Sequence, residues 1–174
     1  MLWLAVCQHG RVTGAAVGAV GAVGKGTELG TTSYAILGLL ALRPGGRGDR
    51  TSGLVWKYQR AVPQLPTVLL YQNVLYMLSD AGVLTTLDPT TGAMHRQARL
   101  RGVADRYFSS PVAGDGKVFI TSQTGIVTVL KAGSGQEVLA ANELDDECYA
   151  TPAIADGRIY IRTRSALYCF GKRD

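Results

Sequence analysis

One fourteen-residue segment occurs twice in this chain, 43 positions apart. Residues 79–92 read SDAGVLTTLDPTTG and residues 122–135 read SQTGIVTVLKAGSG, with serine, glycine, threonine and leucine kept in place. The repeat extends upstream, because TVLLYQNVLYML (67–78) aligns with SPVAGDGKVFIT (110–121) at the same interval. TPAIADGRIYIR (151–162) repeats that second segment after 41 residues. A nearly fixed interval indicates one structural unit that is used several times.

Each copy reads as four short strands. An apolar strand and a second strand flank a hairpin signal, which is Asp115-Gly116 or Asp156-Gly157 in two copies and Gln72-Asn73 in the first. A third strand with alternating polarity follows a turn at Gly82 or Gly125, and a Thr-Gly or Ser-Gly turn leads to the fourth. Four antiparallel strands in about 40–45 residues are typical of one β-propeller blade. A β-sandwich or an open barrel would not require the turns to recur at one interval.

The sequence therefore predicts an all-β fold, a partial β-propeller of about three to four four-stranded antiparallel blades that is not closed. A degenerate copy precedes the others, with strands at 39–42 and 54–58, and the last copy stops at Phe170 after its third strand. Since closed propellers have about 4–8 blades, we expect the C-terminal part of a longer propeller, with an open sheet edge able to self-associate. The expected units are a Gly/Ala/Val-rich extension at 1–33 and blades at about 34–63, 64–103, 104–145 and 146–174.

Four segments resemble the C-terminal blades of bacterial propellers built from pyrroloquinoline-quinone-like (PQQ-like) repeats. They are ALRPGGRGD (41–49), LVWKYQRAVPQLP (54–66), YFSSPVAGDGKVFITSQTGIVTVLKAG (107–133) and ECYATPAIADGRIYIRTRSALYCFGK (147–172). The resemblance covers about residues 35–174. This family includes quinone-dependent alcohol dehydrogenases and outer-membrane assembly lipoproteins. The resemblance implies a propeller fold and a periplasmic or extracellular location.

The chain departs from the repeat of that family at one docking position. The family repeat carries Asp-x-x-Thr-Gly and, four residues later, a Trp that packs one blade on the next. Asp88, Thr91 and Gly92 match, but Arg96 holds the Trp position, so only Trp56 in the degenerate copy is expected to keep this role. Such degenerate docking argues against the regular propellers of the dehydrogenases.

The residues that the enzymes of this family need are not evident in the sequence. Those enzymes have adjacent cysteines under the quinone and a calcium-ligand set, whereas Cys7, Cys148 and Cys169 are widely separated and no oxygen ligands cluster. His9 and His95 are the two histidines, too few for most histidine metal sites. We therefore expect a non-catalytic scaffold or binding module with no catalytic residue, no metal and no PQQ. The alternative is a fragment of a PQQ-dependent dehydrogenase.

Charge and apolar patterning limit the choice of partners. The formal net charge of +5 is scattered along the chain, which does not indicate nucleic acid binding. The two uncharged runs between Arg11 and Arg43 are 13 and 14 residues long, shorter than the roughly 20 that a spanning helix needs. MLWLAVCQHG has no basic residue before its apolar stretch, so no signal peptide is predicted. The expected partner is a protein or a small ligand at the propeller face.

Two groups of residues are candidate binding surfaces. Loops that lead into the innermost strand of a blade border the central channel, where ligands dock. In these loops Phe108 and Tyr149 are equivalent at the 41-residue interval. Blade packing would explain the aromatic residues equally well. The predicted binding rim consists of Arg106, Tyr107, Phe108, Glu147 and Tyr149.

A second candidate is a basic strand face. Arg158, Arg162 and Arg164 alternate with apolar or small residues, so they are expected on one face together with Tyr160. Such a face could bind an anion or an acidic protein. The alternative is that the acidic run at 145–147 or water neutralises the arginines.

Overall fold

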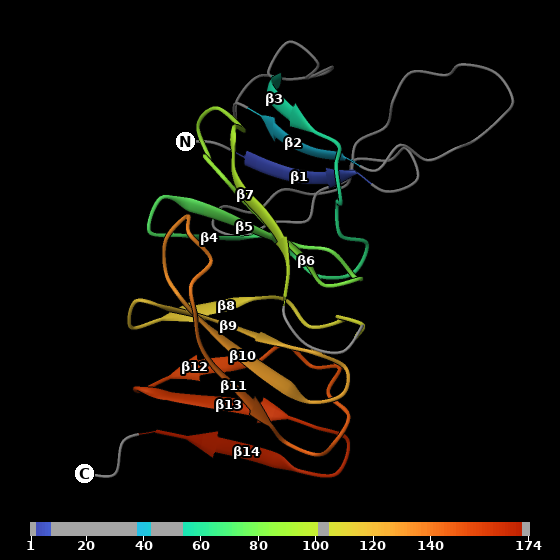
Figure 1. Ribbon diagram of the computed structural model, residues 1–174, viewed down its shortest axis with the longest axis vertical. Coiled ribbons are helices and arrows are strands. Elements are labelled where there is room, and N and C mark those ends of the chain that lie inside the picture. The colour runs from blue at the N-terminus through green and yellow to red at the C-terminus, as the bar shows by residue number, and fades with distance from the viewer. Residues whose placement is uncertain (1–2, 8–37, 43–53, 101–104, 172–174) are drawn as a thin grey trace, which may run out of the picture.

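The computed structural model describes residues 3–7, 38–42, 54–100 and 105–171 as β-strands joined by turns and loops. Within these ranges there is no helix, and hence none able to cross a membrane. The strands form antiparallel sheets that stack one on another, from the N-terminal sheet at the top to the C-terminal sheet at the bottom (Figure 1). The all-β fold of unclosed blades predicted from the repeat is confirmed.

The two central sheets are complete blades of four strands. Their strands follow one another in sequence order, β4 to β7 and β8 to β11, as the repeat predicts. The second sheet consists of β4 (Leu69–Tyr71), β5 (Val74–Leu78), β6 (Val83–Leu87) and β7 (Met94–Arg99). The third consists of β8 (Val112–Gly114), β9 (Lys117–Thr121), β10 (Ile126–Lys131) and β11 (Val138–Glu143).

The two end sheets have three described strands each. The first has the order β1-β2-β3, so a strand from the segment assigned to an N-terminal extension pairs with the degenerate copy. The rest of that extension, residues 8–33, lies outside the described residues. The last sheet has the order β12-β13-β14 among the described residues. The strands are β1 (Trp3–Cys7), β2 (Gly38–Leu42), β3 (Leu54–Tyr58), β12 (Ala153–Ala155), β13 (Arg158–Arg162) and β14 (Leu167–Phe170).

The hairpins predicted between the first and second strands of the last three blades are confirmed. Both central residues of each turn have positive φ, with 47° and 57° at Gln72 and Asn73 and 50° and 69° at Asp115 and Gly116. This is the geometry of a two-residue turn whose twist matches the strands it joins. The third turn, at 156–157, has the same pair of angles within a degree. These hairpins lie on one side of the stack, opposite the turns between the second and third strands (Figure 1).

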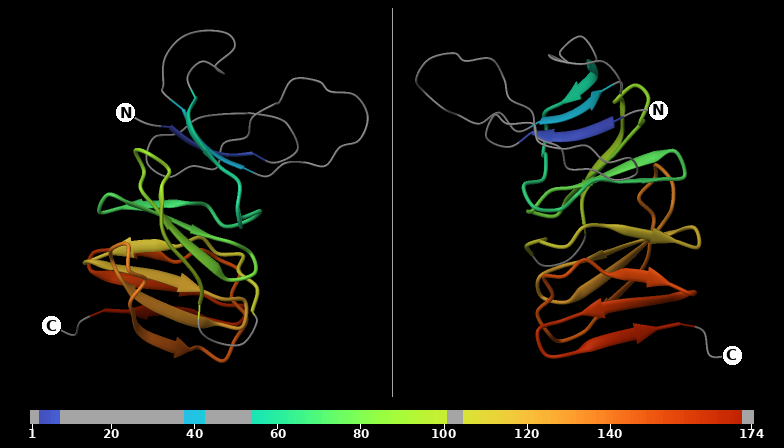
Figure 2. Two further views of the ribbon diagram at one scale, coloured as in Figure 1. Left: turned by 45° about the horizontal axis from the view of Figure 1, so that its top comes forward. Right: turned by 180° about the vertical axis from the view of Figure 1, so that it is seen from behind.

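Apolar side chains fill the spaces between sheets rather than one central core. Trp56 of β3 packs with Leu75 and Met77 of the second sheet, and its indole N–H donates to the carbonyl of Pro89 at 3.1 Å. A Cβ built on Gly92 would lie 2.6 Å from the indole, so glycine makes room for it. Trp56 therefore has the docking role expected from the family repeat. Two views from other sides show the same succession of sheets (Figure 2).

At the next interface hydrogen bonds add to apolar packing. Arg96 holds the Trp position there, and Tyr76 of β5 lies in the apolar cluster that joins the two sheets and reaches the turn of the following blade. The buried Tyr76 hydroxyl donates to the carbonyl of Gly133 at 3.1 Å and accepts from its N–H at 2.6 Å. The Gln136 side chain donates to the carbonyls of Leu84 and Arg96, each at 3.1 Å. Loss of the Trp is thus accompanied by hydrogen bonds to the turn of the next blade.

Candidate functional site

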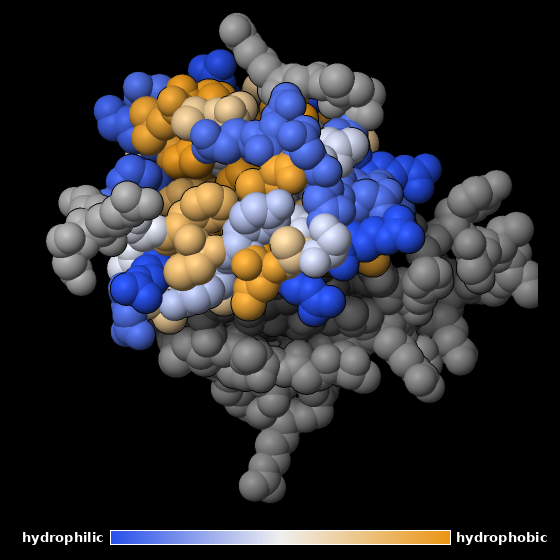
Figure 3. All heavy atoms as spheres, turned by 90° about the horizontal axis from the view of Figure 1, so that it is seen from below, coloured by the Kyte–Doolittle hydropathy of each residue, from blue (hydrophilic) through white to orange (hydrophobic). Residues whose placement is uncertain are grey.

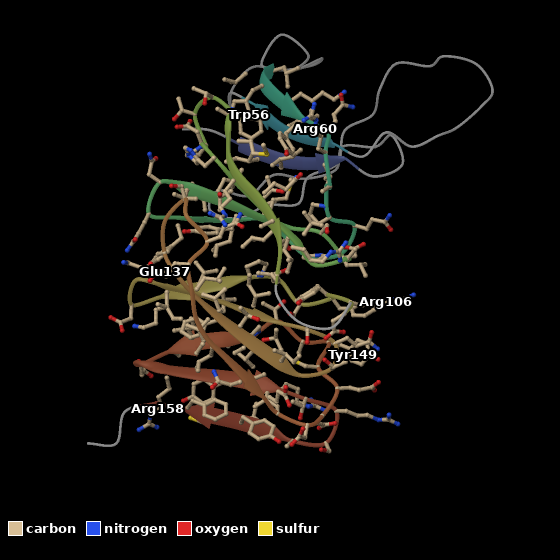
Figure 4. The ribbon with its side chains drawn as sticks, in the orientation of Figure 1. Trp56, Arg60, Arg106, Glu137, Tyr149 and Arg158 are labelled. Atoms are coloured by element: carbon tan, nitrogen blue, oxygen red, sulfur yellow. The ribbon has the colours of Figure 1, made fainter. Side chains whose placement is uncertain are left out.

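The candidate rim is formed where the connections between blades meet the turns between second and third strands. We name residues 105–111 the first connector and 145–152 the second connector. They lie beside the turns at 79–82, 122–125 and 163–166. Arg106 and Tyr149 both lie on this side of the stack, whereas Arg158 and Glu137 lie on the other (Figure 4).

A series of backbone hydrogen bonds joins connectors to turns across the rim. In the first connector, the N–H of Tyr107 donates to the carbonyl of Asp80 at 3.0 Å, and the carbonyl of Arg106 accepts from the N–H of Gln123 at 2.8 Å. In the second connector, the N–H of Cys148 donates to the backbone carbonyl of Gln123 at 2.9 Å, and the carbonyl of Glu147 accepts from the backbone N–H of Arg164 at 2.8 Å. Each connector therefore bonds both the preceding turn and the turn of its own blade. We call this series the rim ladder.

Two aspartates 41 residues apart fix the connectors to the turns of their own blades. Asp105 accepts from the N–H and hydroxyl of Thr124, and Asp146 accepts from the N–H and hydroxyl of Ser165, at 2.8 and 2.6 Å. Burial alone would raise the pKa of Asp105, but hydrogen bonds from Ser122 and Thr124 hold it below its usual value. Hydrogen bonds from Ser165, then Thr163, lower the pKa of Asp146 to about 2. Both carboxylates are therefore charged above acidic pH.

The glycines shared by the two repeated segments permit this close contact. Gly125 has φ of +88°, and a Cβ built there would lie 2.3 Å from the carbonyl oxygen of Asp146. Gly82 has φ of +77°, and its Cβ would lie 2.7 Å from the Tyr107 ring. Glycine adopts this left-handed backbone without strain and has no side chain that would clash with the connector. Each of these turns therefore packs closely against the connector that follows it in the chain.

Two of the predicted rim residues form an aromatic pair that bridges two blades. The rings of Phe108 and Tyr149 are 5.1 Å apart at their centroids and inclined by 52°. Tyr149 is 49% exposed, and its hydroxyl accepts from the Gln123 side chain at 2.9 Å. The inclination is one that aromatic pairs favour, so packing and hydrogen bonding hold the exposed Tyr149 ring in place.

The other predicted rim residues have different surroundings. Tyr107 is only 7% exposed and packs with Val118 and Ile120, and burial raises the pKa of its hydroxyl. Arg106 is exposed beside it. Glu147 lies 3.4 Å from the guanidinium of Arg164. The rim surface available to a partner therefore consists of Arg106, Phe108 and Tyr149, with Tyr107 beneath.

A shallow cavity of about 490 Å³ adjoins this surface. Asp80 forms part of its wall, and the Asp80 carboxylate accepts from the N–H groups of Gln64 and Leu65 at 3.0 and 3.2 Å. Arg99 donates to the carbonyl of Ala81 in the same wall. Sequence reasoning did not select these residues, although Asp80 matches Gln123 in the repeated segment. The cavity is lined by Gln64, Leu65, Asp80, Ala81, Arg99, Asp105, Arg106, Tyr107 and Phe108.

The predicted basic strand face is divided by the structure. Arg158 and Arg162 lie at the two ends of β13, but Arg164 lies in the turn after the strand. Glu147 pairs with Arg164, as the neutralisation alternative expects. Among the described residues no carboxylate lies within 4.0 Å of the Arg158 or Arg162 side-chain nitrogens. Two of the three arginines thus share a face.

The cysteines and the possible metal ligands are dispersed over the described part of the chain. Across those residues, no three His, Cys, Asp or Glu side chains gather as metal ligands. Cys148 is buried in the second connector, with Sγ 3.2 Å from the Arg162 carbonyl, and burial raises its pKa. Cys169 is exposed on β14. The two thiols therefore occupy different places and do not form the adjacent pair those enzymes have.

The stacked four-stranded sheets define a propeller-type protein, and comparison with known proteins specifies the family. A family model described as outer membrane protein assembly factor BamB matches residues 47–174. Because the match covers more than half of the chain, this protein belongs to that family. The resemblance to PQQ-like repeat propellers is thereby confirmed. Among curated proteins, none matches the sequence.

Solved structures share the fold. BamB from Moraxella catarrhalis matches with a TM-score of 0.58 and 23% identity, over 76% of this chain and 39% of that one. Quinohemoprotein alcohol dehydrogenase from Comamonas testosteroni matches with a TM-score of 0.57 and 14% identity, over 74% and 26%. Quinohemoprotein alcohol dehydrogenase ADHIIG from Pseudomonas putida HK5 matches with a TM-score of 0.56 and 15% identity, over 72% of this chain and 25% of that one. The chain therefore spans about two fifths of the BamB structure it matches.

Proposed function

We propose that this chain is a non-catalytic propeller scaffold that binds a protein partner through Arg106, Phe108 and Tyr149. The family description supports a role in outer-membrane protein assembly, and with it a periplasmic location. The proposal treats the chain as the C-terminal part of a propeller, since it spans 39% of the BamB structure. The observation that carries it is the aromatic pair held across two blades, in which Tyr149 is exposed and Phe108 is half-buried.

The composition of this surface favours a protein ligand. Tyrosine, phenylalanine and arginine are enriched in protein interfaces and supply much of their binding energy. Tyr149 offers a large ring with few rotatable bonds, and Gln123 already restrains its hydroxyl. The rim ladder fixes the backbone beneath it. Little conformational entropy would therefore be lost when a partner docks.

The adjoining cavity suits an extended segment of that partner. It combines the apolar surfaces of Leu65 and Phe108 with the guanidiniums of Arg99 and Arg106. Asp80 and Asp105 in the same wall are already bonded to protein N–H or hydroxyl groups. The two carboxylates and the two guanidiniums balance in charge, so apolar surface and guanidinium donors are what the cavity offers a ligand. A peptide with an apolar side chain beside backbone carbonyl acceptors has the matching chemistry.

Site-specific photo-cross-linking tests the proposal. A benzoylphenylalanine at Tyr149 should give a discrete protein adduct in the native host, and Phe108→Ser should reduce its yield about tenfold. The matched control is the same probe at His95, which is exposed on β7 away from the rim. Adducts in equal yield at both positions, or none at 149, would contradict the proposal.

The alternative, a fragment of a PQQ-dependent dehydrogenase, has a separate test. The fold shared with the alcohol dehydrogenases supports it as well as the scaffold. A ligand that binds the native state raises the unfolding midpoint. We expect PQQ with Ca²⁺ to leave the thermal midpoint of this chain unchanged. A saturable rise in the midpoint would favour the enzyme fragment.

A further inference from the structure

Gln123 joins the two connectors of the rim through three hydrogen bonds. Its backbone N–H donates to the carbonyl of Arg106 in the first connector at 2.8 Å, and its backbone carbonyl accepts from the N–H of Cys148 in the second at 2.9 Å. Its side-chain amide donates to the hydroxyl of Tyr149, also at 2.9 Å. The two backbone bonds belong to the rim ladder, whereas the side-chain bond reaches the exposed ring of the proposed binding surface.

The repeat indicates that the side chain of Gln123 is not needed to hold its turn. Asp80 and Arg164 occupy the equivalent positions in the neighbouring repeats. The carbonyl of Asp80 and the N–H of Arg164 make the same backbone bonds to connectors that Gln123 makes. Their side chains bond the connector of their own blade, Asp80 at the N–H of Gln64 and Arg164 at the carboxylate of Glu147. Of these three residues, Gln123 alone directs its side chain to the connector of the next blade.

Exposed apolar area alone does not distinguish the rim as a binding surface. Seen from below, the C-terminal end of the stack also presents apolar side chains among charged ones (Figure 3). Leu167 in β14, for example, is 67% exposed. Tyr149 differs because its ring packs on Phe108, with the ring centroids 5.1 Å apart, while Gln123 holds its hydroxyl. A side chain fixed at two points loses less rotamer freedom when a partner binds.

The bond from Gln123 also determines the direction of the Tyr149 hydroxyl proton. A phenolic hydroxyl can both donate and accept a hydrogen bond. The Gln123 amide donates to this oxygen, so the O–H proton must point away from the amide. Among the described residues, none accepts that proton in a hydrogen bond. Since Tyr149 is 49% exposed, the proton is available to a molecule at the surface.

We propose that Tyr149 donates its hydroxyl proton to a backbone carbonyl of the bound partner segment, and that Gln123 is the positioning residue for this contact. The inference rests on the proposed function, because it concerns the same surface. Next to Phe108, the guanidinium of Arg106 in the cavity wall is a donor as well. An extended segment of a partner leaves backbone carbonyls unpaired along its length, and therefore has the complementary acceptors.

A photo-cross-linking probe at Leu65 tests this inference with the aromatic pair intact. Leu65 is 58% exposed in the cavity wall, and benzoylphenylalanine there should give a discrete protein adduct in the native host. Tyr149→Phe keeps the ring and removes the proton. Gln123→Glu keeps the size of the side chain but accepts the proton itself. Each variant should lower the adduct yield about tenfold.

The double variant separates positioning from a merely structural role. Gln123→Glu combined with Tyr149→Phe should lower the yield no further than either change alone, because both remove the same contact. The thermal midpoints of the variants, compared with that of the wild type, report whether the fold is intact. Gln123→Met brings no charge to the connectors and should also lower the yield, because the ring loses its second point of contact. Losses that multiply in the double variant would overturn the inference.

Gln97 provides the matched control. Its side-chain amide donates to the hydroxyl of Tyr58 at 3.3 Å, and it lies on β7 outside the connectors and the cavity wall. Gln97→Glu therefore makes the same chemical change in another glutamine–tyrosine pair and should leave the yield unchanged. An adduct that persists undiminished in Tyr149→Phe or Gln123→Glu would overturn this inference and leave the proposed function standing. Absence of any adduct in the wild-type background would overturn both.

Discussion

Gly125 has the least room of the glycines at the rim. Its Cβ would meet the carbonyl of Asp146 at 2.3 Å, and its φ of +88° is strained for other residues. Gly125→Ala should therefore lower the free energy of unfolding by roughly 2–4 kcal/mol, the sum of backbone strain and steric conflict. Urea denaturation measures this loss.

Gly116 provides the matched control because only one of these two factors applies to it. It has φ of +69°, but no atom lies within 4 Å of its built Cβ. Gly116→Ala should cost only about 1 kcal/mol, from backbone strain alone. Equal losses in the two variants would contradict the close approach of connector and turn.

Asp146 should make the rim sensitive to acid. Its folded-state pKa of about 2 is below the ordinary value of 3.8, so its hydrogen bonds stabilise the fold above pH 4. This stabilisation falls as the pH drops from 4 through 2. The difference in unfolding free energy between wild type and Asp146→Asn should therefore be large at pH 6 and nearly absent at pH 2. A pH-independent difference would argue against the charged carboxylate as its source.

Tyr76 and Tyr160 are equivalent residues in sheets with different neighbours. Tyr76→Phe removes the hydroxyl that serves both the N–H and the carbonyl of Gly133, so it should cost about 1–3 kcal/mol. Tyr160→Phe should change stability by less than about 0.5 kcal/mol, because no described residue bonds its hydroxyl. Thermal or urea unfolding of both variants gives the comparison. A similar loss at Tyr160 would mean that its hydroxyl also has a hydrogen-bond partner.

The elements were predictable because their signals are local. Alternating polarity and the turn pairs at 115–116 and 156–157 specify strands and hairpins from neighbouring residues alone, and the structure confirms them. The Trp56 docking contact was predictable from the family repeat. The strand at 3–7 was not, because its pairing with β2 depends on residues more than 30 positions away.

The rim could be predicted only in part. Its position followed from the order of the strands, and the equivalence of Phe108 and Tyr149 followed from the repeat. The rim ladder is made of backbone groups, which leave no residue-type signal. Nor did the sequence indicate that Tyr107 is buried while the neighbouring Phe108 is half-buried, because this depends on how the connector turns. The hydrogen bonds between Asp146 and Ser165 had a signal in the sequence, because Asp105 and Thr124 form the same kind of pair 41 residues earlier.

The whole molecule is a stack of blades. The rim runs along one side of the stack and carries Arg106 and Tyr149 (Figure 4). The assigned blade boundaries remain a prediction, which limited proteolysis at the connectors would test.

The rim ladder joins the blades and fixes the backbone of the proposed binding surface. Backbone amide hydrogen exchange, resolved by NMR, measures it directly. The amides of Tyr107, Gln123, Cys148 and Arg164 lie outside strands but donate to carbonyls across the rim. We expect all four to exchange as slowly as strand amides, since they open only when blades separate. Exchange as fast as that of exposed turn amides would contradict the ladder and the surface built on it.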